Sequence, residues 1–144
     1  MSVKRFPSKG WTITLPLGGS DVVIGGLKSL TFAESGPRTN ESVMIDAAAS
    51  EFIAKDPDGH IAVGDATGEV YCDPTPGGTL PLLIAQLSIP PDGATGSAAH
   101  VNGLTLDFPV KAIRTGLAAP AGDQLAIPFT IVIDSLTIAY TAPT

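Results

Sequence analysis

Few residues in this chain could do acid–base or nucleophilic chemistry. Two histidines, His60 and His100, and one cysteine, Cys72, are present. A catalytic imidazole needs a partner that orients it, and each histidine lies at a junction of loop and strand where the sequence supplies no such partner. We predict that both histidines lie at solvent-exposed edges. Cys72 lacks an adjacent cation that would stabilise a thiolate, which favours a small buried apolar role.

Four aspartates, Asp56, Asp58, Asp65 and Asp73, lie in turn-rich segments and carry the oxygen ligands that calcium prefers. The stretch over residues 56–60 lacks the later ligand positions and the closing glutamate of a calcium-binding loop. A single cysteine excludes an intrachain disulfide and a four-thiolate metal site. The aspartates are therefore predicted to form turns, and no metal site is expected.

The sequence lacks the signatures of common enzyme classes. It contains no GxxxxGK(S/T), GxGxxG, GxSxG, HExxH or CxxC pattern, the patterns of phosphate-binding loops, dinucleotide folds, serine hydrolases and zinc sites. No catalytic or cofactor-binding residue is predicted, and we expect a protein that is not an enzyme. Trp11, Tyr71 and Tyr140 could line a sugar-binding platform, but Trp11 shares a strand face with Ile13 and Leu15, which favours a core role.

The composition is that of a folded chain with few charged residues for its surface. Of 144 residues, 44% are hydrophobic and 15% are charged, which excludes intrinsic disorder and fits one domain over residues 1–144. The formal charge of −6 disfavours a groove that grips nucleic acid. No run approaches the about 20 apolar residues that span a bilayer, so no membrane partner is expected. Because monomers rarely expose large apolar patches, the scarcity of charge indicates assembly with other chains.

Alternating apolar residues predict a succession of short strands. In residues 11–17, Trp11, Ile13, Leu15 and Leu17 share one face, the period of a half-buried strand. Further strands are predicted in residues 21–24, 27–32, 41–46, 60–63, 67–72, 104–108, 110–114, 124–134 and 135–140. The last two are apolar on both faces, so we expect them to be buried or paired with another chain. This order predicts a mainly β fold, an antiparallel β-sandwich.

One packed α-helix and a long loop complete the predicted fold. The helix follows a cap at residue 78 or 79, ends before residue 90, and is predicted to pack through one face, formed by Leu80, Leu83, Ile84 and Leu87. Residues 33–60 are a long loop excursion, with a loop at 33–40, helix formers at 47–55 and a turn at 56–59. Residues 92–99, rich in small side chains, are predicted to be a loop. Residues 1–10 are predicted to be an extended basic arm.

In this order the segments resemble the phage major tail protein, or tail tube, family of long-tailed bacteriophages, whose fold is shared with the tubes of contractile tails and type VI secretion. The residues that carry the resemblance are 10–15, 26–31, 43–46, 68–73 followed by the helix at 80–87, and 122–125 running into 129–131. They resemble, in turn, the opening strand, a strand that recurs in the family, the strand before the long loop, the central strand with its packed helix, and the closing hairpin. Ala47-Ala48-Ala49 stands where the family often has threonine or serine.

The resemblance implies a structural subunit of a virion tail, assembled in the bacterial host cytoplasm. Its copies would form rings, expected to be hexameric, that stack into a hollow tube with an acidic lumen through which genomic DNA is ejected without sticking. The other implied partners are the tape measure, the tail terminator and baseplate or tip proteins.

Two other functions stay open. A carbohydrate- or receptor-binding β-sandwich module would use Trp11 and the Gly/Ser loops. An enzyme would use His60 and His100 as a pair, and it is the least favoured of the three.

Overall fold

The computed structural model describes residues 10–18, 20–25, 27–42, 54–73, 75, 78–119, 122 and 124–142. Within these residues the elements follow the order β1 (Trp11–Leu17), β2 (Ser20–Ile24), β3 (Leu27–Phe32), β4 (Gly36–Ser42), β5 (Ala54–Ala62), β6 (Ala66–Tyr71), α1 (Leu80–Ile84), η1 (Ala85–Leu87), β7 (Thr95–His100), β8 (Leu104–Pro109), β9 (Ala112–Thr115), β10 (Ala126–Val132) and β11 (Thr137–Tyr140). They form a five-stranded sheet, β11-β8-β7-β1-β2, a four-stranded sheet, β3-β6-β10-β9, and a two-stranded ribbon, β4-β5.

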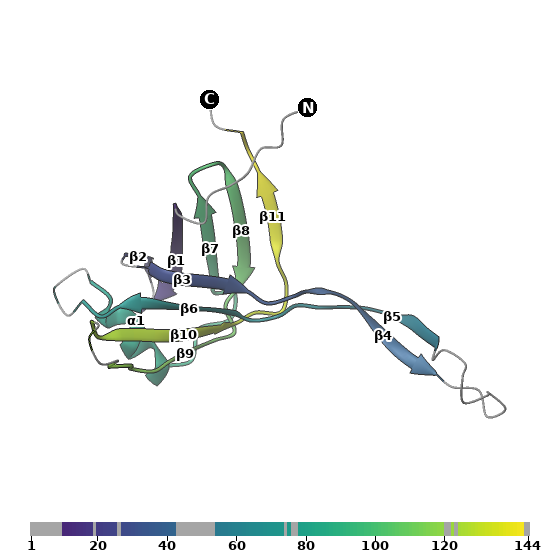
Figure 1. The fold of residues 1–144 in the computed structure, drawn as a ribbon, viewed down its shortest axis with the longest axis horizontal. Helices are drawn as coiled ribbons and strands as arrows, with labels where there is room; N and C mark the ends of the chain where they lie inside the picture. The colour runs from purple at the N-terminus through teal and green to yellow at the C-terminus, as the bar shows by residue number, and fades with distance from the viewer. Residues whose placement is uncertain are drawn as a thin grey trace.

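The two larger sheets pack face to face with their strands crossing, and the core lies between them (Figure 1). Period-two alternation supplies this core: Ile13 and Leu15 of β1 and Ile127 and Ile131 of β10 are each 0% exposed. All strand pairs in these sheets are antiparallel. The strands of the two larger sheets, except β11, turn one face toward the core and the other outward. The mainly β fold with antiparallel sheets and one short helix is therefore confirmed.

The predicted loop over residues 92–99 is wrong from residue 95 onward, because β7 lies in the middle of the five-stranded sheet. Its small side chains are a packing requirement. A Cβ on Gly96 would lie 2.8 Å from Cε2 of Phe108 and 3.0 Å from the carbonyl oxygen of Thr14. The ring of Phe108 therefore fills the space that a larger residue at position 96 would need.

The excursion over residues 33–60 is also more ordered than the sequence predicted. The loop expected at 33–40 ends at residue 35, where β4 begins and pairs with β5. Between this ribbon and the β3–β6 pair, the N–H of Ala33 donates to the carbonyl oxygen of Asp65 (3.1 Å) and the N–H of Gly64 to Oγ of Ser35 (2.9 Å). The ribbon thus continues the four-stranded sheet outward (Figure 1).

The turn predicted at residues 56–59 lies inside β5. The register between the two ribbon strands shifts between Pro37 and Thr39, and Gly59 adopts φ +86° nearby. Turn-forming residues here produce an irregularity within a strand, as a β-bulge does. The predicted strand beyond residue 42 and the helix formers up to residue 53 lie outside the described residues, and residues 54 and 55, the end of that segment, are in β5.

The helix forms where predicted, and Leu83 packs against the core as expected, but the fully buried side chain is Leu82, which the predicted face leaves out. Leu82 is 0% exposed, whereas Leu80 is 39%, Ile84 54% and Leu87 81% exposed. The α-helical part spans five residues before η1 begins, so no stripe of several turns exists. Thr79, just before the helix, attaches the helix to the end of β6. Its buried Oγ1 donates a hydrogen bond to the carbonyl oxygen of Tyr71 (2.9 Å) and accepts one from the backbone N–H of Asp73 (2.7 Å).

The last two strands differ in their environment. β10 is central in its sheet, and Ile127, Phe129 and Ile131 are buried as expected. β11 is an edge strand, and every one of its residues is exposed. Of the two outcomes predicted for residues 135–140, burial within this chain is therefore wrong for β11.

Candidate functional surfaces

The two histidines lie in different sheets and have different environments. His60 is exposed on the ribbon, as predicted, and its backbone N–H donates a hydrogen bond to Oδ1 of Asp58 (2.9 Å). His100 is only 4% exposed, so the predicted solvent-edge position is wrong. Its ring meets Trp11 edge-on, with centroids 5.1 Å apart, and its Nδ1 accepts the N–H of Asn102 (3.1 Å). β1 supplies this aromatic cover, which sequence spacing did not reveal. The folded chain does not bring the histidines together as a catalytic pair.

The aspartates act in local structure. Oδ2 of Asp58 forms an ion pair with Nε of Arg38 (3.2 Å) across the ribbon. Oδ1 of Asp73 accepts the hydroxyl (2.6 Å) and the N–H (3.1 Å) of Thr75, and these hydrogen bonds lower the pKa of Asp73 below its ordinary value. Among the described residues, no three His, Cys, Asp or Glu side chains lie close enough to hold a metal ion.

The cysteine and the aromatic residues belong to separate surroundings. Cys72 packs against the core, half-buried, and its N–H donates to the carbonyl oxygen of Leu125 (2.8 Å). Tyr71 lies in the four-stranded sheet, with Nζ of Lys28 5.4 Å from its ring centroid. Trp11 packs against the core from β1, and Tyr140 lies three strands away in β11. These positions do not form the common platform that a sugar-binding module would need.

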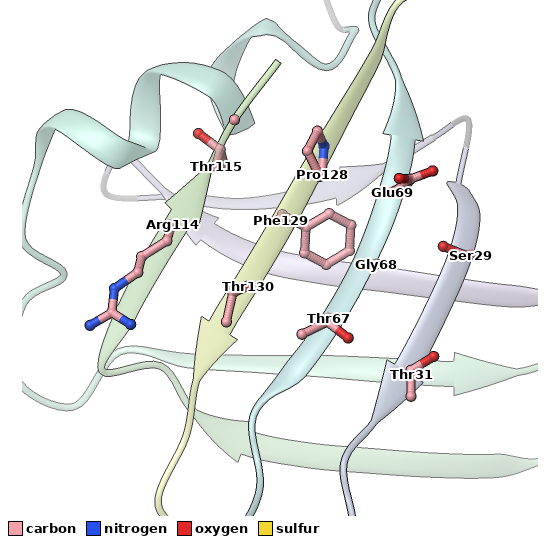
Figure 2. A pocket seen from close by; sticks show the side chains of 11 residues that line it. Ser29, Thr31, Thr67, Gly68, Glu69, Arg114, Thr115, Pro128, Phe129 and Thr130 are labelled. Atoms are coloured by element: carbon pink, nitrogen blue, oxygen red, sulfur yellow. The ribbon is translucent and has the colours of Figure 1, made fainter. Parts of the chain in front are cut away.

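The outer face of the four-stranded sheet carries a shallow hollow of about 490 Å³. Figure 2 shows the side chains of Ser29, Thr31, Thr67 and Thr130 on adjacent strands. Arg114 lies on the edge strand β9, and Glu69 lies on β6, between β3 and β10. We call the outward-facing set Ser29, Thr31, Thr67, Glu69, Arg114, Pro128 and Thr130 the hydroxyl face. Its two charged residues have opposite signs. The hydroxyl groups of this surface can hydrogen-bond water, and the surface offers no acid–base pair of the kind that catalysis needs.

The exposed apolar residues avoid this face. In the described part of the chain, the large hydrophobic residues at least 39% exposed are Val23, Ile61, Leu80, Ile84, Leu87, Ile89, Val101, Leu117, Leu125, Ile138 and Tyr140. None of them belongs to β3, β6, β9 or β10. The exposed apolar residues thus lie on the sheet edges, the ribbon, the helix and the loops, whereas the outer face of the four-stranded sheet is polar.

The two larger sheets have four edge strands among the described residues: β11 and β2 end the five-stranded sheet, and β3 and β9 end the four-stranded one. An edge strand presents a row of backbone donors and acceptors that a second chain can pair with. β11 has the sequence Thr-Ile-Ala-Tyr without a charge, and β2 exposes Val23 by 59%. Protective charges or prolines that would block pairing are missing from β11.

No protein-family model matches the sequence, and neither does any curated protein sequence. Solved structures do match along almost the whole chain. A protein in the cryo-EM structure of the anti-feeding prophage baseplate, which is sixfold symmetrised, superposes with a TM-score of 0.62 at 10% identity, over 97% of this chain and 98% of the other.

Two further structures come from tubes. The sheath–tube complex of PVC, an extracellular contractile injection system in its extended state, contains a chain with a TM-score of 0.60 at 14% identity, covering 95% of this chain and 93% of that one. The SPP1 tail tube gives 0.62 at 10% identity, covering 97% and 82%. The resemblance to tail tube proteins predicted from the sequence is therefore confirmed as a shared fold.

Proposed function

We propose that this chain is a structural virion protein, the tail tube subunit of a phage or phage-like particle, whose copies assemble into stacked hexameric rings around a hollow conduit. The observation that carries the proposal is the match of the whole chain, from β1 to β11, to proteins of tail and injection tubes. A shared fold alone does not assign a function, so the proposal also rests on the surfaces of this chain.

The edges and apolar residues supply what a ring needs. A head-to-tail contact that repeats by rotation pairs one edge of a copy with the other edge of the next, and it closes when the rotation divides a full turn. This chain offers two edges on each sheet and exposes apolar side chains on β2 and β11. The sixfold symmetry of the baseplate assembly that contains a chain of this fold supports a hexamer.

The hydroxyl face suits the wall of the conduit for genomic DNA. Its strands hold none of the large exposed apolar residues of the described chain, and the charges of Glu69 and Arg114, which line its hollow, cancel. The wall we propose is therefore coated with hydroxyl groups, and its weak adhesion to DNA comes from neutral hydration in place of the acidic lumen that the resemblance implies. Such a role is structural, and it is exercised in the virion tail with the tape measure, terminator and baseplate or tip proteins as partners.

Electron microscopy and sedimentation of the purified protein test the proposal. We expect rings and tubes with sixfold averages at high protein concentration. A species that stays monomeric under every salt and concentration condition would refute it. Val23→Lys should block assembly if β2 forms the ring contact, because a lysine on an edge strand opposes pairing. Val23→Thr, which keeps the shape without the charge, should assemble normally.

Thiol labelling of assembled tubes tests the wall. In a Cys72→Ala background, a cysteine replacing Thr67 on the hydroxyl face should react with a small maleimide that diffuses into the bore and resist a bulky polymer-linked one. A cysteine replacing Thr12, which is exposed on the other sheet, should react with both. Equal reaction of Thr67→Cys with the bulky reagent would place the hydroxyl face outside the channel.

A further inference from the structure

The two charged residues of the hydroxyl face lie toward opposite ends of the four-stranded sheet. Arg114 is on the edge strand β9, and Glu69 is on β6, one strand in from the other edge, β3. Figure 2 shows them on either side of β10. Neither side chain forms an ion pair with another described residue. Each charge is therefore available to a group on another copy.

The number of strands in this sheet suits a junction between copies. Every neighbouring pair in β3-β6-β10-β9 is antiparallel, so β3 and β9, the first and last of its four strands, run in opposite directions. A rotation that brings the β9 edge of one copy to the β3 edge of the next therefore makes one more antiparallel pair. The five-stranded sheet has an odd number of strands. A rotation would bring its edges β2 and β11 together as a parallel pair, which is less stable per residue.

The hydrogen bonds at the strand ends show which backbone groups of β3 and β9 point away from the sheet. The N–H of Gly116 donates to the carbonyl oxygen of Pro128 (3.0 Å), and the N–H of Ala33 donates to that of Asp65 (3.1 Å). In an antiparallel ladder, hydrogen-bonded pairs of residues alternate with pairs that are not hydrogen-bonded. The residues whose backbone groups point outward are therefore 113 and 115 on β9, and 30 and 32 on β3.

One alignment of these two edges also brings the charges together. When Ile113 lies opposite Leu30 of the next copy, their outward backbone groups can pair, and Arg114 lies opposite Ser29 on the hydroxyl face. Ser29 is itself paired with Glu69 in its own copy. Two strand spacings of about 4.8 Å then separate the Cα atoms of Arg114 and that Glu69 by about 10 Å. An arginine side chain, with six staggered bonds of about 1.5 Å, spans about 7 Å, so its guanidinium can pass over the small Ser29 to the carboxylate.

We propose that Arg114 of one copy forms an ion pair with Glu69 of the next copy, at a junction where β9 lies beside β3 and Arg114 lies opposite Ser29. This inference rests on the proposed function, because it needs copies related by rotation about one axis. The ion pair specifies the register of the junction, since sliding β9 by two residues would put Thr31 opposite Arg114 and lengthen the distance to Glu69. It also neutralises two charges that each copy leaves unpaired on the hydroxyl face.

Charge reversal in separate copies of the full chain tests the ion pair. Arg114→Glu alone and Glu69→Arg alone each put like charges at every junction, so each variant should need about tenfold more protein than the parent to form tubes. An equimolar mixture of the two variants should form tubes at the parent's concentration, because alternating copies restore an opposite pair at every junction of a six-membered ring. A pair made within one copy would gain nothing from mixing.

Lys111→Glu is the matched control, because it makes the same change of charge next to β9. Lys111 pairs there with the exposed Asp134 (3.7 Å), and this variant should form tubes like the parent. Single variants at positions 69 and 114 that assemble as readily as the parent, or a mixture that assembles no better than either variant, would overturn the ion pair and leave the proposed function standing. Failure of the parent protein to form any assembly would overturn both.

Discussion

The helical segment formed by α1 and η1 gives a direct test of the packing argument, because Leu82 in α1 and Leu87 in η1 have opposite environments. Leu82 is 0% exposed and Leu87 is 81% exposed. Leu82→Ala removes three buried carbon atoms and leaves a cavity, a change that costs about 2–5 kcal/mol in protein cores. Because the five-residue helix can shift to fill part of the space, we expect about 3 kcal/mol. For a domain of this size that lowers Tm by roughly 10 °C.

Leu87→Ala removes the same atoms from solvent and should change stability by less than about 0.5 kcal/mol. Both values follow from urea unfolding monitored by circular dichroism, at concentrations low enough to keep the protein unassembled. The sequence pattern alone assigns Leu87 to the packed face and leaves Leu82 out of it. Equal losses for the two variants, or a larger loss for Leu87→Ala, would refute the packing described here.

Two further outcomes follow from local geometry. Gly68→Ala should destabilise the β3–β6 pair, because its Cβ would clash with the carbonyl oxygen of Ser29 and lie 2.8 Å from Cζ of Phe129. Gly25→Ala is the control and should be tolerated, because the space around Gly25 is open. Equal melting temperatures for the two variants would contradict this prediction. Hydrogen bonds from Thr75 lower the pKa of Asp73 in the folded protein. The ionised Asp73 carboxylate therefore stabilises the folded state at pH values above the ordinary aspartate pKa, and this stabilisation is lost as the pH falls through the lowered pKa of the folded protein. Thr75→Val should raise that pKa toward its ordinary value in an NMR titration, and an unchanged pKa would exclude the hydroxyl as its cause.

The candidate surfaces were only partly accessible to sequence reasoning. The lack of paired catalytic groups and the scarcity of charge pointed away from an enzyme and toward assembly. His100 was misplaced because its burial depends on Trp11, which is 89 positions earlier in the chain and meets it only through the β1–β7 register. The hydroxyl face was missed because Ser29, Thr67 and Thr130 come from three strands that are adjacent in space alone.

By itself the sequence determined the period-two strands, since alternation in residues 11–17, 27–32 and 104–108 is a local property that one buried face imposes. It also determined the position of the helix, through Pro81 in its first turn and the prolines at 90 and 91 after it. Only the tertiary structure decided that small residues at 95–99 form a central strand, because the need for Gly96 arises from the ring of Phe108. It likewise decided which helix face is buried and that residues 36–42 pair with 54–62, since these depend on contacts between segments distant in sequence.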